Sequence, residues 1–359
     1  MSLPKSFSIK VAGGKTIDMP SVGFGTWAAG DTSWAKDSTL TALKEGYRHI
    51  DGAWMYGVDE AVGQAIKECG VPREEIFYTS KAWPHFFSPE NVELCLDKVL
   101  HQTGLEYVDL FLVHWPFALK PISRSALEES FSTPTASNEE KGILTDPSSG
   151  KPAIDYEHTS TPINKKVGQH GSFLPTWKAM QELVRKGKTR AIGVSNFSIP
   201  DIEVLLDESK EIPISCNQVE AHPWLPQTEL LEYCKKHEIL VSCYSPFAGQ
   251  KSDGGKPLIK DEKVVELAEK NGMDAGQLLQ SWAVQRGTVP LGKSQTPARI
   301  KSNLDVKKLS EEDVKTLDGL AIPNDEGRTV NGHLMFGLPL FDKPGQAAHI
   351  NDVQYQSKV

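Results

Sequence analysis

Apolar, β-branched segments alternate with amphipathic segments along most of this chain. Eight apolar segments have the length and composition of buried strands. They cover residues 21–27, 47–53, 76–83, 108–115, 189–197, 214–222, 239–247 and 288–294. Between them, apolar residues recur at the spacing of one helix face. The predicted helices cover residues 59–69, 89–104, 176–187, 199–209, 228–237, 274–287 and 297–304.

Eight strands that alternate with helices predict an α/β fold with a parallel sheet, and eight strands close a (β/α)8 barrel. Residues 6–19 alternate around Gly13 and Gly14, which predicts an N-terminal β-hairpin ahead of the barrel. A doubly wound sheet would need a GxGxxG motif after its first strand, and the GFGTW segment does not match it. We therefore predict a (β/α)8 TIM barrel that forms one domain over residues 1–359.

One segment breaks the regular spacing of the strands. A barrel unit takes about thirty residues, yet the ends of two successive strands, His114 and Ser195, are 195 − 114 = 81 positions apart. The excess, residues 118–172, is rich in Ser, Thr, Pro, Lys and Glu and has no hydrophobic period. We predict a loop inserted after the fourth strand. Such a loop is either a partly disordered surface segment or an active-site lid, and its position favours a lid in part.

Composition excludes several classes of protein. The 359 residues are 39% hydrophobic and 24% charged, which is ordinary for a globular protein. The net charge of −8 argues against a nucleic-acid or membrane partner. No apolar run could span a bilayer, and the first ten residues lack the core of a secretory signal. Five scattered cysteines show no metal-ligand spacing. We expect a cytoplasmic protein without a metal, as a monomer, with a dimer as the alternative.

The predicted strands end in side chains that a packed core does not need. In barrels of this kind the active site is built at the C-terminal ends of the strands. The residues at these ends are Trp27; Asp51, with Tyr56 beyond it; Lys81 and Trp83; His114 and Trp115; Ser195 and Asn196; Gln218; Tyr244 and Ser245; and Lys293 and Ser294. One histidine or aspartate at such a position is more often structural. Packing alone does not explain polar ends on all eight strands, so we predict an active site at this mouth.

The residue types indicate proton and hydride chemistry. A tyrosine such as Tyr56 holds its proton to about pH 10, so as an acid catalyst it needs a nearby cation. Lys81 can supply that charge, and Asp51 can orient Lys81. His114 can donate a hydrogen bond to a carbonyl oxygen. Three tryptophans would form an apolar wall for the substrate: Trp27, Trp83 and Trp115.

A basic cluster follows the last predicted strand. Lys293, Ser294 and Arg299 lie at a strand-to-helix junction. Helix N-termini with basic side chains bind phosphate, so the cluster points to an anionic cofactor. The alternative is a solvated surface face.

Taken together, these segments resemble the aldo-keto reductase superfamily. The matching segments run in family order from about residue 7 to residue 340, nearly the whole chain. They are GFGTW, YRHIDGAWMYGVDEAVGQAI, TSKAW, VDLFLVHWP, GKTRAIGVSNFS, NQVEAHPWLPQ, CYSPFAG and KSQTPARIKSN. The resemblance implies an NADPH-dependent reductase of aldehydes or ketones, similar to fungal members that act on small aldehydes and sugars.

The resemblance also assigns roles to residues. It implies that Tyr56 is the general acid, that Lys81 and Asp51 tune it, and that His114 orients the carbonyl group. The implied substrate contacts are Trp27, Tyr56, Trp83, His114 and Trp115. The implied cofactor contacts are Gly25, Thr26, Trp27, Asp51, Ser195, Asn196, Gln218, Tyr244, Ser245, Phe247, Lys293, Ser294, Arg299 and Asn303. Among these, Lys293, Ser294 and Arg299 would bind the 2′-phosphate, which favours NADPH over NADH. The tail, residues 325–359, would fold over the pocket and help to set the substrate range.

Some residues of this chain differ from those common in the family, and two other functions fit the same residues. Gly52 replaces the threonine of many relatives, and Gly292 replaces a common proline. The same residues would serve an alcohol or polyol dehydrogenase that works in the oxidative direction. They would also serve a cofactor-binding regulatory subunit with little turnover. Relatives that reduce C=C bonds carry glutamate at the position of His114, so the histidine argues against that reaction.

Overall fold

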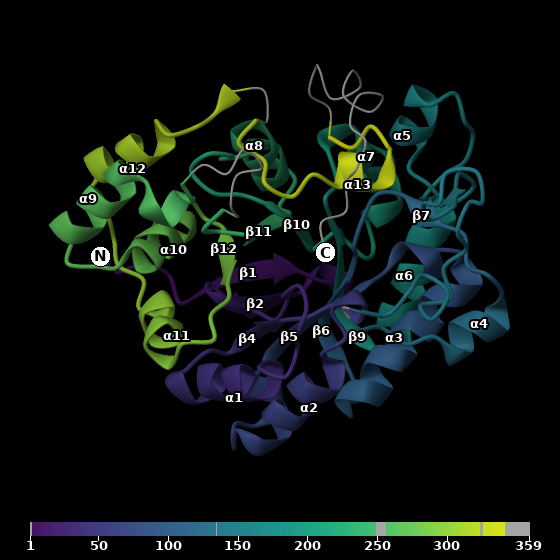
Figure 1. Cartoon of the computed structure of the whole chain (residues 1–359), viewed down its shortest axis with the longest axis horizontal. Helices are drawn as coiled ribbons and strands as arrows, with labels where there is room; N and C mark the ends of the chain where they lie inside the picture. The colour runs from purple at the N-terminus through teal and green to yellow at the C-terminus, as the bar shows by residue number, and fades with distance from the viewer. Residues whose placement is uncertain (1, 134, 249–255, 324–325, 342–359) are drawn as a thin grey trace.

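The computed structural model describes residues 2–133, 135–248, 256–323 and 326–341. Its centre is a closed barrel of eight parallel strands, which pair in the order β10-β11-β12-β3-β4-β5-β6-β9. The strands are β3 (Gly23–Gly25), β4 (His49–Asp51), β5 (Phe77–Ala82), β6 (Val108–Val113), β9 (Thr189–Ser195), β10 (Cys216–Glu220), β11 (Leu240–Tyr244) and β12 (Val289–Gly292). The last strand pairs with the first, Leu291 opposite Gly23, and this closes the barrel. The predicted (β/α)8 fold is confirmed (Figure 1).

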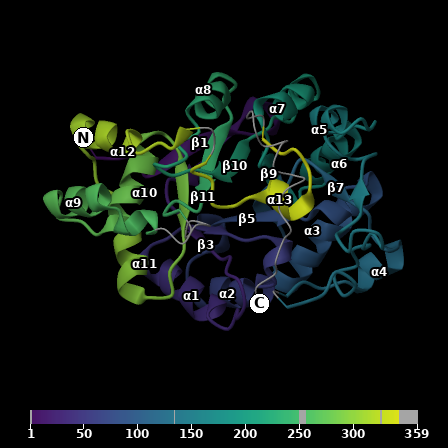
Figure 2. The ribbon, with the colours of Figure 1, turned by 45° about the horizontal axis from the view of Figure 1, so that its top comes forward.

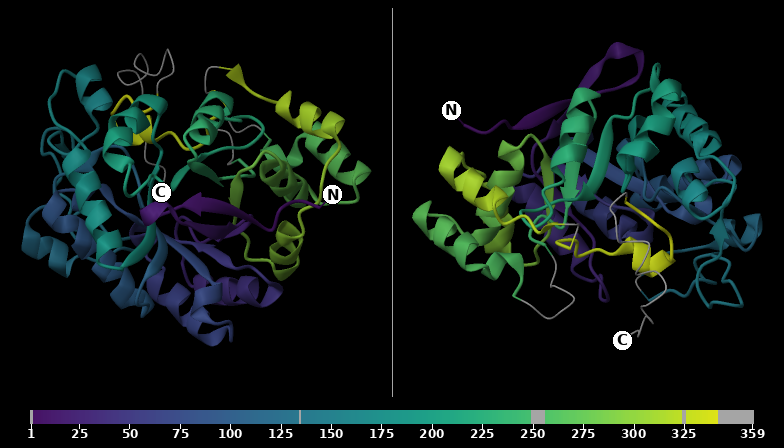
Figure 3. Two further views of the ribbon diagram at one scale, coloured as in Figure 1. Left: turned by 180° about the vertical axis from the view of Figure 1, so that it is seen from behind. Right: turned by 90° about the horizontal axis from the view of Figure 1, so that it is seen from above.

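The predicted hairpin precedes the barrel. Strands β1 (Ser6–Lys10) and β2 (Thr16–Pro20) pair antiparallel. Its buried side chains Ile9, Val11 and Met19 pack in one cluster with residues that point into the barrel, such as Leu110. The hairpin lies across the barrel in the rear view (Figure 3, left). It therefore closes the end opposite the strand C-termini.

Helices surround the strands (Figure 2). All seven predicted helices are present: α2 (Asp59–Glu68), α3 (Pro89–Thr103), α6 (Leu174–Arg185), α7 (Ile199–Leu206), α8 (Thr228–Lys236), α10 (Ala275–Gln285) and α11 (Pro297–Leu304). The sequence pattern missed α1 (Ala35–Glu45), because its buried face includes small and hydroxylated residues such as Ser38 and Thr39. It also missed α9 (Glu262–Lys270) and α12 (Glu311–Asp318), which the eight-unit pattern does not require.

The inserted loop of residues 118–172 forms a small substructure of its own. Strands β7 (Ala118–Leu119) and β8 (Ile154–Asp155) pair antiparallel, and the loop also contains α4 (Arg124–Glu129) and α5 (Thr161–Lys166). The loop is fastened to α3, because Lys98 Nζ donates to the carbonyl oxygens of Glu128 at 2.7 Å and Ser130 at 2.9 Å.

The tail reaches the barrel mouth through one short helix, α13 (Gly332–Phe336). In the view from above, it runs from α12 toward the inserted loop (Figure 3, right). Phe336 packs on the aromatic rings of Trp115 and Phe117, with ring centroids 5.7 and 4.6 Å apart. Of the predicted tail, residue 325 and residues 342–359 lie outside the described residues. Across the described ranges, no helix is long and apolar enough to cross a membrane.

Candidate active site

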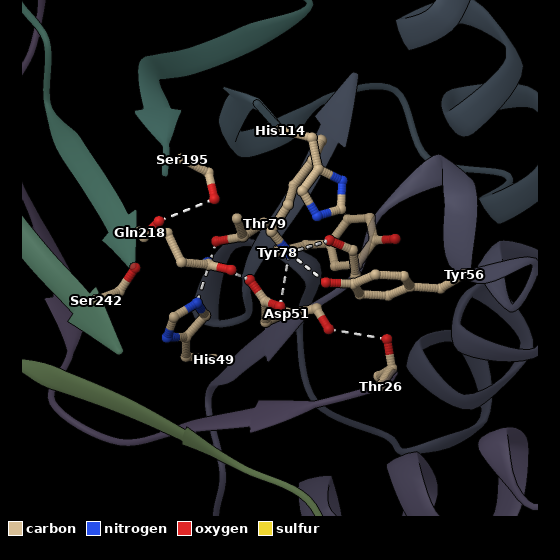
Figure 4. A network of polar contacts seen from close by, with 12 residues as sticks. Thr26, His49, Asp51, Tyr56, Tyr78, Thr79, His114, Ser195, Gln218 and Ser242 are labelled. Carbon is tan, nitrogen blue, oxygen red and sulfur yellow. Dashed lines mark hydrogen bonds and ion pairs between the residues drawn. The ribbon is translucent and has the colours of Figure 1, made fainter. Parts of the chain in front are cut away.

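Four polar side chains predicted to act together do lie together. Asp51 ends β4, Tyr56 lies in the 3-10 turn η2 (Trp54–Tyr56), Lys81 lies in β5 and His114 directly follows β6. Parallel pairing brings these strand ends to one edge of the barrel. The Tyr56 hydroxyl and the His114 ring face the same space (Figure 4).

Lys81 is the centre of a buried hydrogen-bond network. Its Nζ donates to Asp51 Oδ2 at 2.7 Å, to the carbonyl oxygen of Gly52 at 2.8 Å and to the hydroxyl of Tyr56 at 3.2 Å. A lysine ammonium has three N–H donors, so every donor has an acceptor. The Lys81 side chain is fully buried, and the position of its charge is therefore fixed.

Asp51 is held from two further directions. Its Oδ1 accepts a hydrogen bond from Gln218 Nε2 at 2.8 Å, and its backbone oxygen accepts one from Thr26 Oγ1 at 2.8 Å. Gln218 lies in β10, and Thr26 directly follows β3. Gln218, which the resemblance assigns to the cofactor, thus also orients the carboxylate that pairs with Lys81.

Burial sets the protonation states in this site. Burial and the charge of Asp51 raise the pKa of Tyr56 well above its usual value of 10. Burial and the charge of Lys81 hold the pKa of His114 well below its usual 6.5. Burial is the larger of the two causes for Tyr56. At neutral pH, Tyr56 carries its proton and the His114 imidazole is neutral.

Aromatic rings enclose the His114 side chain. The ring of Trp83 packs edge-on against the His114 ring, with ring centroids 5.1 Å apart. The ring of Trp115 lies parallel to the His114 ring, with centroids 6.3 Å apart. The indole nitrogen of Trp83 and Nδ1 of His114 are buried, and neither has a hydrogen-bond partner within the described part of the chain. Such unpaired buried groups are costly unless a ligand pairs them.

A cavity of about 200 Å³ lies beside Tyr56. Its lining comes from three places in the sequence and consists of Trp27, Ala28, Ala29, Gly30, Met55, Tyr56, Thr133 and Lys141. Trp27 is 59% exposed and forms the rim. The three tryptophans predicted to contact the substrate therefore lie in two places. Trp27 lines this cavity, whereas Trp83 and Trp115 pack against Phe336. Thr133 and Lys141 belong to the inserted loop and were not predicted.

The comparisons with known proteins agree with this geometry. The model of the Aldo/keto reductase family matches residues 21–322. The chain belongs to this family. Aldehyde reductase YPR1 of Saccharomyces cerevisiae is 40% identical over 91% of this chain and 94% of its own length. Glycerol 2-dehydrogenase (NADP(+)) of the same yeast is 40% identical over 87% of this chain and 91% of its own. D-galacturonate reductase of Hypocrea jecorina is 38% identical over 84% of this chain and 87% of its own.

Membership makes the chain an oxidoreductase of carbonyl and CH–OH groups that uses a nicotinamide cofactor. In this aldo/keto reductase, the inner group of predicted cofactor residues is connected by hydrogen bonds. Tyr244 donates to Asn196 Oδ1 at 2.7 Å, Asn196 Nδ2 donates to the His114 carbonyl oxygen at 2.9 Å, and Ser195 Oγ donates to the Gln218 carbonyl oxygen at 2.8 Å.

These residues fit a nicotinamide carboxamide. Asn196 and Ser245, which follow β9 and β11, have φ of 64° and 49°, which is costly for residues other than glycine and recurs at binding sites. Oε1 of Gln218 accepts no hydrogen bond from any described residue, so it is free to accept one from a carboxamide. Gly25 and Thr26 belong to the same inner group, because Thr26 binds Asp51.

The outer group lies along β12 and α11 of this aldo/keto reductase. Lys293 Nζ lies 4.3 Å from the ring centre of Trp34, and Arg299 is in the first turns of α11. Neither forms an ion pair with a described residue, which leaves two cations for an anionic ligand. Phe247 packs beside Gly292, where an added Cβ would lie 2.9 Å from its Cζ. Ser294 and Asn303 are buried in the same region.

One buried carboxylate, which the sequence analysis did not single out, holds the tail. Glu220 ends β10, and its carboxylate accepts hydrogen bonds from the backbone nitrogens of Thr329 at 2.7 Å and Val330 at 3.0 Å. It also accepts from Thr329 Oγ1 at 2.6 Å and His222 Nε2 at 2.9 Å. Burial alone would raise the pKa of Glu220, but the hydrogen bond and charge of His222, the charge of Arg328 and the hydrogen bond from the Thr329 side chain lower it to about 2. The only signal in the sequence was an acidic residue at the end of a core strand.

Replacing Glu220 by glutamine tests this anchor. In glutamine an NH2 group replaces one of the two oxygens, so at least one of these donors loses its acceptor. We expect the free energy of unfolding to fall by about 3 kcal/mol. Limited proteolysis should cut the tail faster, while Glu232→Gln, at an exposed site on α8, should behave as the parent protein. In the parent, the stabilisation is present above pH 4.5 and is lost as the pH falls toward about 2. Unchanged proteolysis of the tail would contradict this role.

Proposed function

We propose that this aldo/keto reductase reduces aldehydes or ketones with NADPH and that Tyr56 is the proton donor. One observation supports the proposal above all: Tyr56 carries its proton, and its hydroxyl lies 3.2 Å from the buried ammonium of Lys81. The neutral His114 ring lies beside it, with ring centroids 5.8 Å apart. A neutral imidazole with a pKa well below 6.5 is a poor proton donor, so the tyrosine is the better acid of the two.

The chemistry then follows from the positions of these groups. When bound, the dihydronicotinamide supplies a hydride to the carbonyl carbon. Tyr56 gives its hydroxyl proton to the carbonyl oxygen, so that hydride and proton together make an alcohol. Lys81 stabilises the phenolate left on Tyr56, and Asp51 keeps Lys81 in place. His114 donates an N–H to the same oxygen as charge develops on it. In the reverse direction, the same groups oxidise an alcohol.

NADPH is proposed over NADH because of Lys293 and Arg299. A 2′-phosphate carries about two negative charges, and an arginine guanidinium binds phosphate through paired hydrogen bonds. Ser294 Oγ, which accepts from the Thr296 backbone nitrogen at 3.1 Å, still has its hydroxyl proton to donate. A yeast relative also carries NADP(+) in its name.

The double variant Lys293→Met/Arg299→Met tests the preference. We expect its Kd for NADPH to rise at least about tenfold, since two charge-assisted contacts are removed, and its Kd for NADH to change little. Fluorescence titration measures both constants. Lys301→Met is the control, because Lys301 lies on the same helix and pairs with Glu45 at 3.6 Å. Equal losses for the two cofactors would contradict the assignment.

The function itself is tested by NADPH consumption. Glyceraldehyde, an aromatic aldehyde and a set of aldoses are suitable first substrates, because the similar proteins include an aldehyde reductase and a D-galacturonate reductase. Turnover of these carbonyl compounds supports the proposal. A similar protein is named glycerol 2-dehydrogenase (NADP(+)), so glycerol with NADP+ is the matching test of the oxidative direction. Tight NADPH binding without turnover in either direction would favour a regulatory subunit.

A further inference from the structure

We propose that Lys141 binds a carboxylate on the substrate, so that the preferred substrates are aldehydes or ketones that carry an acid group. This inference rests on the proposed function, since it takes the cavity beside Tyr56 as the substrate pocket. Lys141 and Tyr56 both line that cavity. It comes from the inserted loop, 85 positions after Tyr56 (141 − 56 = 85).

The inserted loop is packed tightly against the turn that carries Tyr56. Ser132 Oγ donates to the carbonyl oxygen of Met55 at 2.9 Å. Gly57, with φ of 64°, lets the loop approach, because an added Cβ would lie 2.4 Å from the Ser132 carbonyl oxygen and 2.8 Å from Thr133 Cα. The wall formed by Thr133 and Lys141 is therefore part of the pocket and is not a distant surface loop.

Lys141 forms no direct ion pair with any described carboxylate, and Glu140 acts on its charge only at longer range. The residue is 7% exposed, and its ammonium donates to one group, the carbonyl oxygen of Ala136. No described carboxylate lies within ion-pair distance of its Nζ, and the cavity lining contains no acidic residue. Its acidic neighbour in sequence, Glu140, accepts instead from the Ser137 backbone nitrogen at 2.7 Å. Lysine is rarely buried without a partner, because a buried charge needs pairing.

The pocket suits a small organic anion. Two of the three N–H donors of Lys141 remain for a ligand, and Thr133 lines the same cavity. A bound carboxylate would supply the missing direct ion pair and turn the reactive carbonyl group toward Tyr56. A volume of about 200 Å³ suits a small molecule. The protein has a net charge of −8, so this buried cation is a local exception in an acidic molecule.

The test compares acids with their neutral counterparts. Glyoxylate, succinate semialdehyde and 4-carboxybenzaldehyde place the carboxylate at three distances from the carbonyl group, and the methyl ester of each removes the charge. We expect the parent enzyme to have at least a tenfold higher kcat/KM for one of the acids than for its ester. Lys141→Met should remove this preference mainly by raising KM for the acid. It should leave kcat/KM for the ester within about twofold of the parent value. Lys141→Arg should retain the preference, and Lys120→Met, at an exposed site of the same loop, should not alter it.

The outcomes separate this inference from the proposed function. If the parent enzyme turns over every acid and its ester equally well, the role of Lys141 is overturned and the proposed reductase function stands. Equal losses for acids and esters in Lys141→Met show a structural role and also overturn it. Where no carbonyl compound turns over, calorimetry with 4-(hydroxymethyl)benzoate decides. Binding that is lost in Lys141→Met supports the carboxylate site, and binding that is equal in both proteins overturns it.

Discussion

Replacing Tyr56 by phenylalanine lowers kcat about 1,000-fold, the contribution expected of a well-placed general acid. The variant loses only the hydroxyl that donates the proton, and the aromatic ring that packs against His114 remains. Lys81 keeps its bonds to Asp51 and Gly52 and loses one acceptor, so the free energy of unfolding should fall by about 1–3 kcal/mol. Single-turnover measurement of NADPH oxidation reports the chemical step directly.

A matched substitution separates loss of the proton from general damage. His114→Gln keeps a hydrogen-bond donor near the carbonyl oxygen and should retain more activity than Tyr56→Phe. Titration with NADPH should give the same Kd for the parent and Tyr56→Phe, because the hydroxyl is placed at the carbonyl group and not at the cofactor. A Tyr56→Phe enzyme with nearly full kcat would exclude the tyrosine as the acid. The neutral His114 would then have to be reconsidered as donor.

Replacing Lys81 by methionine has the second large effect, on both stability and activity. Methionine fills most of the lysine volume but leaves the Asp51 carboxylate buried without its partner. Removing one member of a buried ion pair typically costs about 3–5 kcal/mol. Tyr56 also loses the cation that stabilises its phenolate, so the rate should fall at least as far as in Tyr56→Phe. Urea unfolding and the NADPH assay measure the two effects.

A double-mutant cycle identifies the cause of the lost stability. Asp51→Asn removes the carboxylate charge, so Asp51→Asn/Lys81→Met should be more stable than Lys81→Met alone. It should remain inactive, because the cation beside Tyr56 is still missing. Additive losses of stability in the double variant would show that the pair is not coupled in the folded protein.

One departure from the family has a local explanation. At Gly52, an added Cβ would lie 2.7 Å from the hydroxyl of Tyr78. That hydroxyl donates to Asp59 Oδ1 at 2.8 Å. A larger residue at position 52 would therefore displace a buried hydrogen bond next to the backbone carbonyl that holds Lys81. The glycine and Tyr78 are a matched pair in this chain, which the sequence alone did not reveal.

The sequence was enough to predict the barrel and the edge at which the candidate site lies. Strand and helix periodicity is a local property, so eight alternating units could be read directly from hydrophobic positions. The polar ends of these strands, such as Asp51 and Lys81, then had to meet, because parallel strands of a closed barrel share one edge. Helix α1 was missed because residues such as Ser38 and Thr39 form part of its buried face, and these do not appear apolar in the sequence.

Only the tertiary structure decided what closes the mouth of the barrel and which charges face it. Glu220 and Thr329 are 109 positions apart, and no local pattern predicts their hydrogen bond. Phe336 covers Trp115, and Lys141 reaches the cavity of Tyr56 from a loop without hydrophobic period. Such contacts depend on how irregular segments fold back over the barrel. Their partners are set by packing in three dimensions, which the spacing of residues along the chain does not record.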